Sequence, residues 1–172
     1  MQIIRHQVSY FITFAIISLI FAVGQSNAQE GTSISIPSIG VEAAIVEAPL
    51  TPDLTTWDVS HLYMNVGHLI GTGWFGSGSN IVLGGHSETA SLAPDIFYNL
   101  DAVHVDDIIT VNANGTQYQY IVTQVYSVSQ FDVSIAYPTR HEQLTLITCQ
   151  RDSYDSSVGQ YQNRVVVVAV PL

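Results

Sequence analysis

The sequence predicts an all-β protein whose sheet is closed, or nearly closed, into a barrel. Short apolar runs recur along the chain and are separated by Gly, Pro, Asn and Ser, a pattern typical of strands joined by tight turns. Almost no segment beyond the N-terminal region has the periodicity of a long helix. A closed barrel is the expected arrangement because it leaves no strand edge unpaired.

Composition excludes one large class of function. The chain has 172 residues and a formal charge of −10, from 14 acidic and 4 basic residues. This length is typical of one domain with a sizeable core. So few cations exclude nucleic-acid binding, which requires neutralisation of phosphates, and the acidic surface repels anionic lipid headgroups. The basic residues are all arginines: Arg5, Arg140, Arg151 and Arg164.

The first 28 residues are interpreted as an export segment. Arg5 precedes a mostly apolar run at 8–23, and a basic flank before such a run is typical of secretory signals. Ser26-Asn27-Ala28 offers a small-x-small site for cleavage after Ala28. The length of the run leaves two alternatives, a cleaved signal peptide and a retained N-terminal membrane anchor. In both, the remainder lies outside the cytoplasm, because Arg5 favours an N-terminus on the inside.

The exported part is expected to begin with a linker at 29–33 and to continue as one domain at 34–172. Its first strand, at 34–36, stops at Pro37 and is therefore expected to lie at a sheet edge. A second strand spans 41–46.

One or two short helices and a hairpin complete the predicted elements. Thr55-Thr56 fits the N-terminal cap of a short helix, and the segment at 94–100 fits one or two helical turns. Asn114-Gly115 predicts a two-residue turn between a strand at 108–111 and a return strand that runs to about Tyr126.

The segment at 144–149 is predicted to be a short strand that ends at Cys149, the only cysteine of the chain. A thiol at a strand end is held by a rigid element and can be reached from outside, as a nucleophile requires. A lone cysteine also fits a small buried core residue. Exported proteins, however, use cysteines in disulfide pairs, so an unpaired thiol in such a chain indicates reactivity.

Two further residues have the same placement at a strand border. His86 follows the apolar run at 81–83 and the pair Gly84-Gly85, whose missing side chains suit close approach of a backbone or a substrate. Arg164 opens a valine strand at 165–168 that is predicted to be buried on both faces. Taken singly, the histidine also fits a structural role and the arginine a surface ion pair.

Together these residues form a chemically complete set. The Cys149 thiol can attack a carbonyl, the His86 imidazole can move protons, and the Arg164 guanidinium can stabilise an oxyanion. Both His86 and Arg164 are expected to favour the ionised thiol. Arg151 is a rival for the role of Arg164, but it lies in a polar loop, and a strand fixes direction better.

With these motifs the sequence resembles the sortases, the cysteine transpeptidases of bacterial cell surfaces. The segment at 145–149 fits the Thr-Leu-x-Thr-Cys signature of that family, Gly85-His86 fits its histidine, and Arg164 fits its arginine. The resemblance runs from about Ile34 to Leu172. The Asp-Pro-aromatic lid of the pilin-polymerising members is missing from the sequence, and Thr51-Pro52-Asp53 is a poor substitute for it.

The resemblance implies a barrel of about eight strands and a thioester with the threonine of an LPxTG-like sorting signal, resolved by an amine of peptidoglycan or a pilin. It implies that Cys149 is the nucleophile, that His86 is the general acid and base, and that Arg164 stabilises the intermediate or the substrate backbone. The loop from Ser127 to Gln143 would form the signal-binding wall. The sites expected to bind substrate are this loop, Thr145 and Thr148. The expected partners are surface proteins that carry a C-terminal sorting signal.

No metal or cofactor is expected. A zinc site would need more ligands at suitable spacing. Calcium at Glu88, Asp106 or Asp107 stays an alternative because some sortases bind calcium, but no loop motif supports it. Two other functions stay open: a non-catalytic exported binding module and a cysteine peptidase that hydrolyses without transfer.

Overall fold

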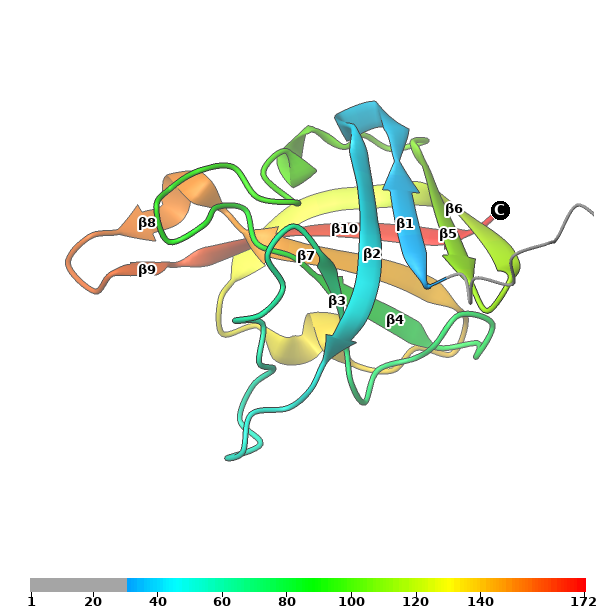
Figure 1. Ribbon diagram of the computed structural model, residues 1–172, viewed down its shortest axis with the longest axis horizontal. Coiled ribbons are helices and arrows are strands. Elements are labelled where there is room, and N and C mark those ends of the chain that lie inside the picture. Colours follow the sequence, from blue (N-terminus) through cyan, green and yellow to red (C-terminus); the bar gives the residue numbers. More distant parts are fainter. Residues whose placement is uncertain (1–30) are drawn as a thin grey trace, which may run out of the picture.

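Residues 31–172 are described by the computed structural model, so the predicted export segment at 1–28 lies outside the described part. Eight strands close into a barrel in the order β1-β2-β3-β4-β7-β10-β6-β5, which confirms the predicted class (Figure 1). A separate two-stranded hairpin, β8-β9, extends the chain between β7 and β10. The strands are β1 (Ser33–Ile36), β2 (Val41–Ala48), β3 (Val66–Leu69), β4 (Asn80–Gly84), β5 (Ile108–Ala113), β6 (Thr116–Ser129), β7 (Gln143–Cys149), β8 (Tyr154–Asp155), β9 (Gln160–Tyr161) and β10 (Asn163–Pro171).

The barrel is mixed. β2 pairs with β3 and β4 pairs with β7 in parallel, whereas the other neighbouring strands of the barrel are antiparallel. The parallel pairing of β4 with β7 brings together two segments that are far apart in the chain. It aligns Gly84 with Ile147, so the C-terminal ends of both strands emerge at the same end of the barrel.

The helical content differs from the expectation, because the described residues form only 3-10 turns and no α-helix. These turns are η1 (Pro37–Ile39), η2 (Leu100–Ala102), η3 (Val133–Ala136) and η4 (Arg151–Ser153). Near Thr55-Thr56 the chain forms turns and bends, and Leu54 and Met64 have left-handed φ angles of 59° and 55°, which interrupt a right-handed helix. Pro94 pairs with Glu88 in an isolated bridge, so its segment starts extended and becomes helical only at η2. Within residues 31–172, no helix is long and apolar enough to cross a membrane.

The expectation of an edge position for the first strand is wrong. β1 pairs with β2 on one side and with β5 on the other, which closes the barrel. Pro37 does not interfere, because it comes after the strand, at the start of η1, where its missing N–H is not needed by the ladder. The predicted hairpin is confirmed: Asn114 and Gly115 connect β5 to β6 with φ angles of 52° and 74°, as a type I′ turn requires.

Apolar side chains pack on both sides of the wall formed by β4, β7 and β10. Inward-facing residues such as Leu83, Leu146 and Val167 belong to the main core. On the outer face, Ala48, Leu69 and Val82 form a second buried cluster. This second cluster is covered by four partly buried side chains: Trp57, Val59, Ala136 and Ile147. Burial on both faces is confirmed for Val165–Val168. The outer cluster of Ala48, Leu69 and Val82 lies next to the C-terminal ends of β4 and β7, and we call it the apolar floor.

Candidate active site

Cys149 is the last residue of β7 and pairs with Arg164 of β10 in the antiparallel ladder. Side chains of directly opposed residues point to the same face of a sheet, with Cβ atoms about 5 Å apart. The thiol is free and half-buried. The strand pair therefore places a reactive atom and a cation side by side on the outer face of the barrel.

The loop after β4 brings His86 to the same place. The Gly85 N–H donates to the Ile147 carbonyl at 3.1 Å, and the Thr148 hydroxyl donates to the Gly85 carbonyl at 2.8 Å. These two bonds fasten the chain just before His86 to the strand that carries Cys149. Thr148 is 4% exposed, so its hydroxyl serves this internal bond in the free protein.

The His86 ring is held in one tautomer. Its Nε2 lies 2.8 Å from the Val59 carbonyl, which can only accept a hydrogen bond, so Nε2 carries a hydrogen. The other ring nitrogen, Nδ1, is therefore the atom that can gain or lose a proton without breaking this contact.

The two glycines before His86 differ in their surroundings. A Cβ on Gly85 would lie 2.6 Å from Phe97 Cδ2 and 2.9 Å from Ile96 Cγ2, whereas a Cβ on Gly84 would meet only Leu69 at 3.5 Å. The close approach expected from the sequence is thus made at Gly85 by the protein's own buried Phe97. Gly85 allows the chain to pass over Phe97 on its way to His86.

One cavity of about 250 Å³ is lined by His86, Cys149 and Arg164 together. The structure therefore brings together all three residues that the sequence singled out. The rest of the lining is mostly apolar or glycine: Thr56, Trp57, Val59, Leu69, Gly84, Gly85, Ile147 and Thr148. A mostly apolar lining with a few converging polar side chains is typical of a ligand-binding cavity.

The electrostatics of the cavity oppose ionisation of the thiol. Burial raises the pKa of Cys149, the Arg164 cation lowers it in part, and the Glu88 carboxylate raises it further. The sequence-based expectation that the neighbours favour the thiolate therefore holds for Arg164, but burial outweighs it. Arg164 is itself oriented by hydrogen bonds from Nη1 to the carbonyls of Tyr161, at 2.9 Å, and Asn163, at 3.0 Å.

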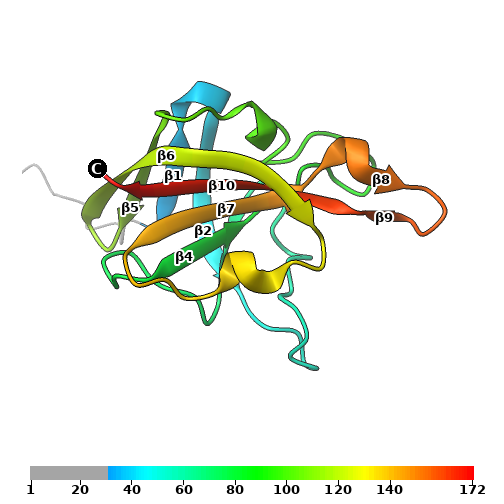
Figure 2. The ribbon, with the colours of Figure 1, turned by 180° about the vertical axis from the view of Figure 1, so that it is seen from behind.

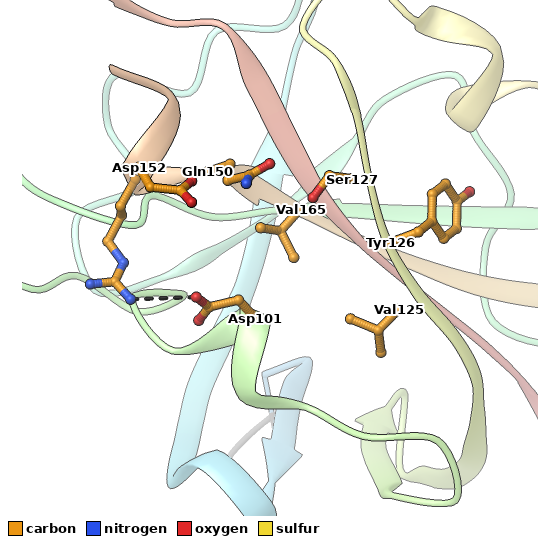
Figure 3. Close-up of a pocket in the computed structure, with 8 residues that line it drawn as sticks. Asp101, Val125, Tyr126, Ser127, Gln150, Asp152 and Val165 are labelled. Atoms are coloured by element: carbon orange, nitrogen blue, oxygen red, sulfur yellow. Dashed lines mark ion pairs between the residues drawn. The ribbon is translucent and has the colours of Figure 1, made fainter. Parts of the chain in front are cut away.

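Arg151, the rival arginine, faces a different cavity. Its guanidinium lies 3.5 Å from an Asp101 carboxylate oxygen and 3.9 Å from the ring centroid of Tyr98. This second cavity, of about 390 Å³, is lined by Asp101, Val125, Tyr126, Ser127, Gln150, Arg151, Asp152 and Val165 (Figure 3). Neither Cys149 nor His86 lines it, although it is the larger of the two.

The loop expected to bind substrate packs on the outer wall. β6 continues to Ser129, and η3 follows within the connection to β7. Ala136 of η3 packs against the apolar floor. Thr145 is 1% exposed and donates its hydroxyl to Asn80 Oδ1 at 2.7 Å, so it supports this wall from within.

Sequence reasoning missed Asn80 and Tyr161, and it considered Glu88 only as a candidate calcium ligand. Asn80 is a buried polar residue at the start of β4, and Tyr161 donates a hydrogen bond of 2.6 Å to Glu88, which links the hairpin to the segment after His86. The signal for Asn80 was present, since a polar residue at the border of a buried apolar strand needs internal partners. The Glu88–Tyr161 contact spans 73 positions and has no local signal.

Within residues 31–172, no three His, Cys, Asp or Glu side chains converge as a metal site would require. Two of the three acidic residues considered for calcium have other contacts. Glu88 accepts from Tyr161, and Asp107 accepts from the backbone N–H of His104 at 2.9 Å.

A closed barrel that presents a thiol, an imidazole and a guanidinium in one cavity is typical of cysteine-dependent acyl transfer. A family profile described as the sortase domain matches residues 34–172. The chain therefore belongs to the sortase family. As a member it is a cysteine transpeptidase of a family that acts outside the cytoplasm on proteins with sorting signals.

Solved structures agree with this assignment. Sortase A from Corynebacterium diphtheriae, as a lid mutant, is 29% identical with a TM-score of 0.64, over 85% of this chain and 74% of that chain. Sortase C-1 from Actinomyces oris is 26% identical with a TM-score of 0.65, over 82% of this chain and 73% of that chain. A sortase D5 transpeptidase from Clostridium perfringens, at 24% identity and a TM-score of 0.64 over 82% and 78% of the two chains, supports the fold alone. No curated protein sequence matches the chain.

Proposed function

We propose that this sortase cleaves an LPxTG-like sorting signal through a thioester on Cys149 and transfers the acyl group to an amine of the cell envelope or of a pilin. The observation that carries the proposal is the shared cavity of Cys149, His86 and Arg164, with its apolar floor. In this proposal Cys149 is the nucleophile, His86 the general acid and base, and Arg164 the group that stabilises the oxyanion or holds the substrate backbone.

The first half-reaction forms the thioester. The Cys149 thiol gives its proton to Nδ1 of His86 as the sulfur attacks the threonine carbonyl carbon, and the oxygen gains negative charge beside the Arg164 guanidinium. When the intermediate collapses, the bond from carbonyl carbon to nitrogen breaks. The leaving amine takes a proton from His86, and Nδ1 is the ring atom free to supply it because Nε2 is bound to Val59.

The second half-reaction reverses these roles. An acceptor amine attacks the thioester carbonyl and gives its proton to His86, and the bond from carbonyl carbon to sulfur breaks. Cys149 leaves and regains a proton from His86, and a new amide is formed. Arg164 can serve both tetrahedral intermediates, because its place opposite Cys149 is fixed by the ladder.

We assign the binding of the sorting signal to the apolar floor and to the loop from Ser127 to Gln143. Leu69, Ile147 and Trp57 all line the cavity, and all three belong to or pack against the apolar floor. Thr145 and Thr148 contribute by holding the walls through their internal hydrogen bonds. As a retained anchor, the region at 1–28 would keep the domain at 34–172 on the external face of the cell membrane. As a signal peptide, it would be removed by cleavage after Ala28 and the domain would be released. Mass spectrometry of the mature N-terminus distinguishes the two.

Mass spectrometry of the protein after incubation with a sorting-signal peptide tests this function. An acyl adduct on Cys149 is expected in the wild type and not in Cys149→Ala. An added amine should convert the adduct to a transpeptidation product, and without an amine slow hydrolysis should release the acid. Hydrolysis that an amine does not divert would identify a peptidase, and no adduct at all would contradict the proposal.

A further inference from the structure

The side chain of Asn80 connects the barrel to the loop after β6. Asn80 is the first residue of β4 and is 2% exposed. Its Nδ2 donates to the carbonyls of Ile135, at 2.9 Å, and Tyr137, at 3.0 Å. Its Oδ1 accepts from the Thr145 hydroxyl at 2.7 Å. Both amide hydrogens and the carbonyl oxygen are therefore used, which is the arrangement that a buried amide requires.

Within the described chain, the other hydrogen bonds that attach this loop to the barrel lie at its two ends. At the start, the Gln130 N–H donates to the Gln162 carbonyl at 2.8 Å. At the end, Glu142 accepts from the Tyr120 hydroxyl at 2.8 Å and from the Gly78 N–H at 3.1 Å. The middle of the loop, around η3, receives its two bonds from Asn80.

Apolar packing gives the middle of the loop only partial support, from the half-buried side chains of Ile135 and Ala136. Phe131 is 80% exposed, Val133 is 59% exposed and Tyr137 is 61% exposed. Ala136 packs against the apolar floor, but its single methyl group buries little surface. The two hydrogen bonds from Asn80 are therefore the main polar attachment of η3 beside β4 and β7 (Figure 2).

The same strand also leads to the imidazole. β4 runs from Asn80 to Gly84, and His86 follows two residues later. The loop is thus attached to one end of a rigid strand while the proton-transferring residue extends from the other end. A shift of the loop relative to β4 would change the groove without moving Cys149 or His86.

We propose that Asn80 is a positioning residue that sets the shape of the sorting-signal groove by holding η3 against the outer wall of the barrel. This inference rests on the proposed function, in which the loop forms one wall of the groove. It assigns to Asn80 an effect on peptide binding and no part in the chemical step.

The test uses Asn80→Asp, which keeps the shape of the side chain and the acceptor for Thr145 but removes both donors to the loop. Asn112→Asp is the matched control, because it makes the same change of charge at an exposed position on β5. Three quantities are measured: steady-state hydrolysis of a sorting-signal peptide without an amine, hydrogen exchange of the amides at 133–139, and alkylation of Cys149 by a methanethiosulfonate reagent.

In Asn80→Asp we expect KM for the peptide to rise about tenfold or more, since two internal hydrogen bonds are lost, while kcat changes little. Exchange of the loop amides should accelerate. The rate of Cys149 alkylation should stay that of the wild type, because the thiol and its neighbours are untouched. Asn112→Asp should match the wild type in all three measurements.

An unchanged KM in Asn80→Asp, or a fall in kcat alone, would overturn the inference. Asn80→Ser, which is neutral, lacks the two amide N–H donors and has too short a side chain to replace both bonds, controls for the added carboxylate and should reproduce the rise in KM. If both variants lost cooperative unfolding, Asn80 would hold the sheet itself and the inference would fail. Failure of the proposed function would look different, because the wild type would then form no thioester, whereas exchange of the loop amides would still report on Asn80.

Discussion

Arg164 and Cys149 are directly opposed residues of adjacent strands, at the point where β7 ends and β10 begins. The ladder fixes their separation, and both side chains leave the sheet on its outer face. The chemistry of the thiol therefore depends on a balance between this cation and the burial that opposes ionisation.

The first prediction concerns the pH dependence of the thiol. Because burial raises the pKa of Cys149, alkylation should keep accelerating with pH beyond the point where an exposed cysteine levels off. The measurement is the rate of methanethiosulfonate alkylation against pH, with a short unfolded peptide at 144–150 as the control. An inflection at or below that of the peptide would contradict the direction of the shift.

The second prediction uses the two charges that act on the thiol in opposite directions. Arg164→Gln removes a cation that lowers the pKa of Cys149, so alkylation at a fixed neutral pH should slow. Glu88→Gln removes an anion that raises it, so alkylation should accelerate. The opposite changes in alkylation rate serve as the control, since general damage to the site would change the rate of both variants in the same direction.

Arg164→Gln should also reduce kcat/KM for the sorting-signal peptide by about a hundredfold or more, because a donor to the oxyanion is lost. The measurement is steady-state kinetics at a pH where the alkylation rates of the variant and the wild type are equal. This choice separates stabilisation of the oxyanion from ionisation of the thiol. A kcat/KM close to that of the wild type under this condition would remove Arg164 from the proposed mechanism.

A fourth prediction follows from the close contact at Gly85. Gly85→Ala places a Cβ against the buried Phe97 ring and should lower the free energy of unfolding by about 1–3 kcal/mol. Gly84→Ala is the matched control, because its Cβ meets only ordinary contact distances. Urea unfolding measures both, and equal stabilities would mean that Phe97 moves aside without cost.

The last prediction concerns the bond that fastens the chain before His86. Thr148→Val leaves the Gly85 carbonyl without its donor and should cost about 1–3 kcal/mol of stability. It should also lower kcat, because the imidazole loses its support, while Thr148→Ser retains the hydroxyl and most of the activity. Denaturant unfolding and peptide hydrolysis are the measurements, and a loss of activity in Thr148→Ser equal to that in Thr148→Val would exclude the hydroxyl as the cause.

Much of the barrel could be predicted from the sequence because its signals are local. The turn at Asn114-Gly115 and the doubly buried strand at 165–168 need no knowledge of distant partners. The pairing of the strands of Cys149 and Arg164 could also be predicted, since a single polar loop joins them. The edge position of the first strand was predicted wrongly because Pro37 directly follows it. A proline next to a strand indicates a sheet edge, but in the structure Pro37 starts η1 after the ladder has ended.

Other parts of the site could not be derived from sequence patterns. His86 reaches Cys149 through the parallel pairing of β4 with β7, a contact between segments about sixty positions apart. The partners of Asn80 in the loop are the backbone carbonyls of Ile135 and Tyr137. Every residue has such a carbonyl, so the residue types at 135 and 137 do not indicate the contact. Burial of the thiol, which decides the direction of its pKa shift, results from the whole cavity and not from any one neighbour.

The hairpin of β8 and β9 follows β7 and the turn η4 after Cys149, and the chain returns to the barrel just before Arg164. The strand ladder sets the register of these two residues, while the hairpin supplies the Tyr161 carbonyl that orients Arg164 and the Tyr161 hydroxyl that binds Glu88. A change in the length of this hairpin that retains Tyr161 should therefore leave Cys149 and Arg164 opposed, whereas replacement of Tyr161 would alter the surroundings of both Arg164 and Glu88.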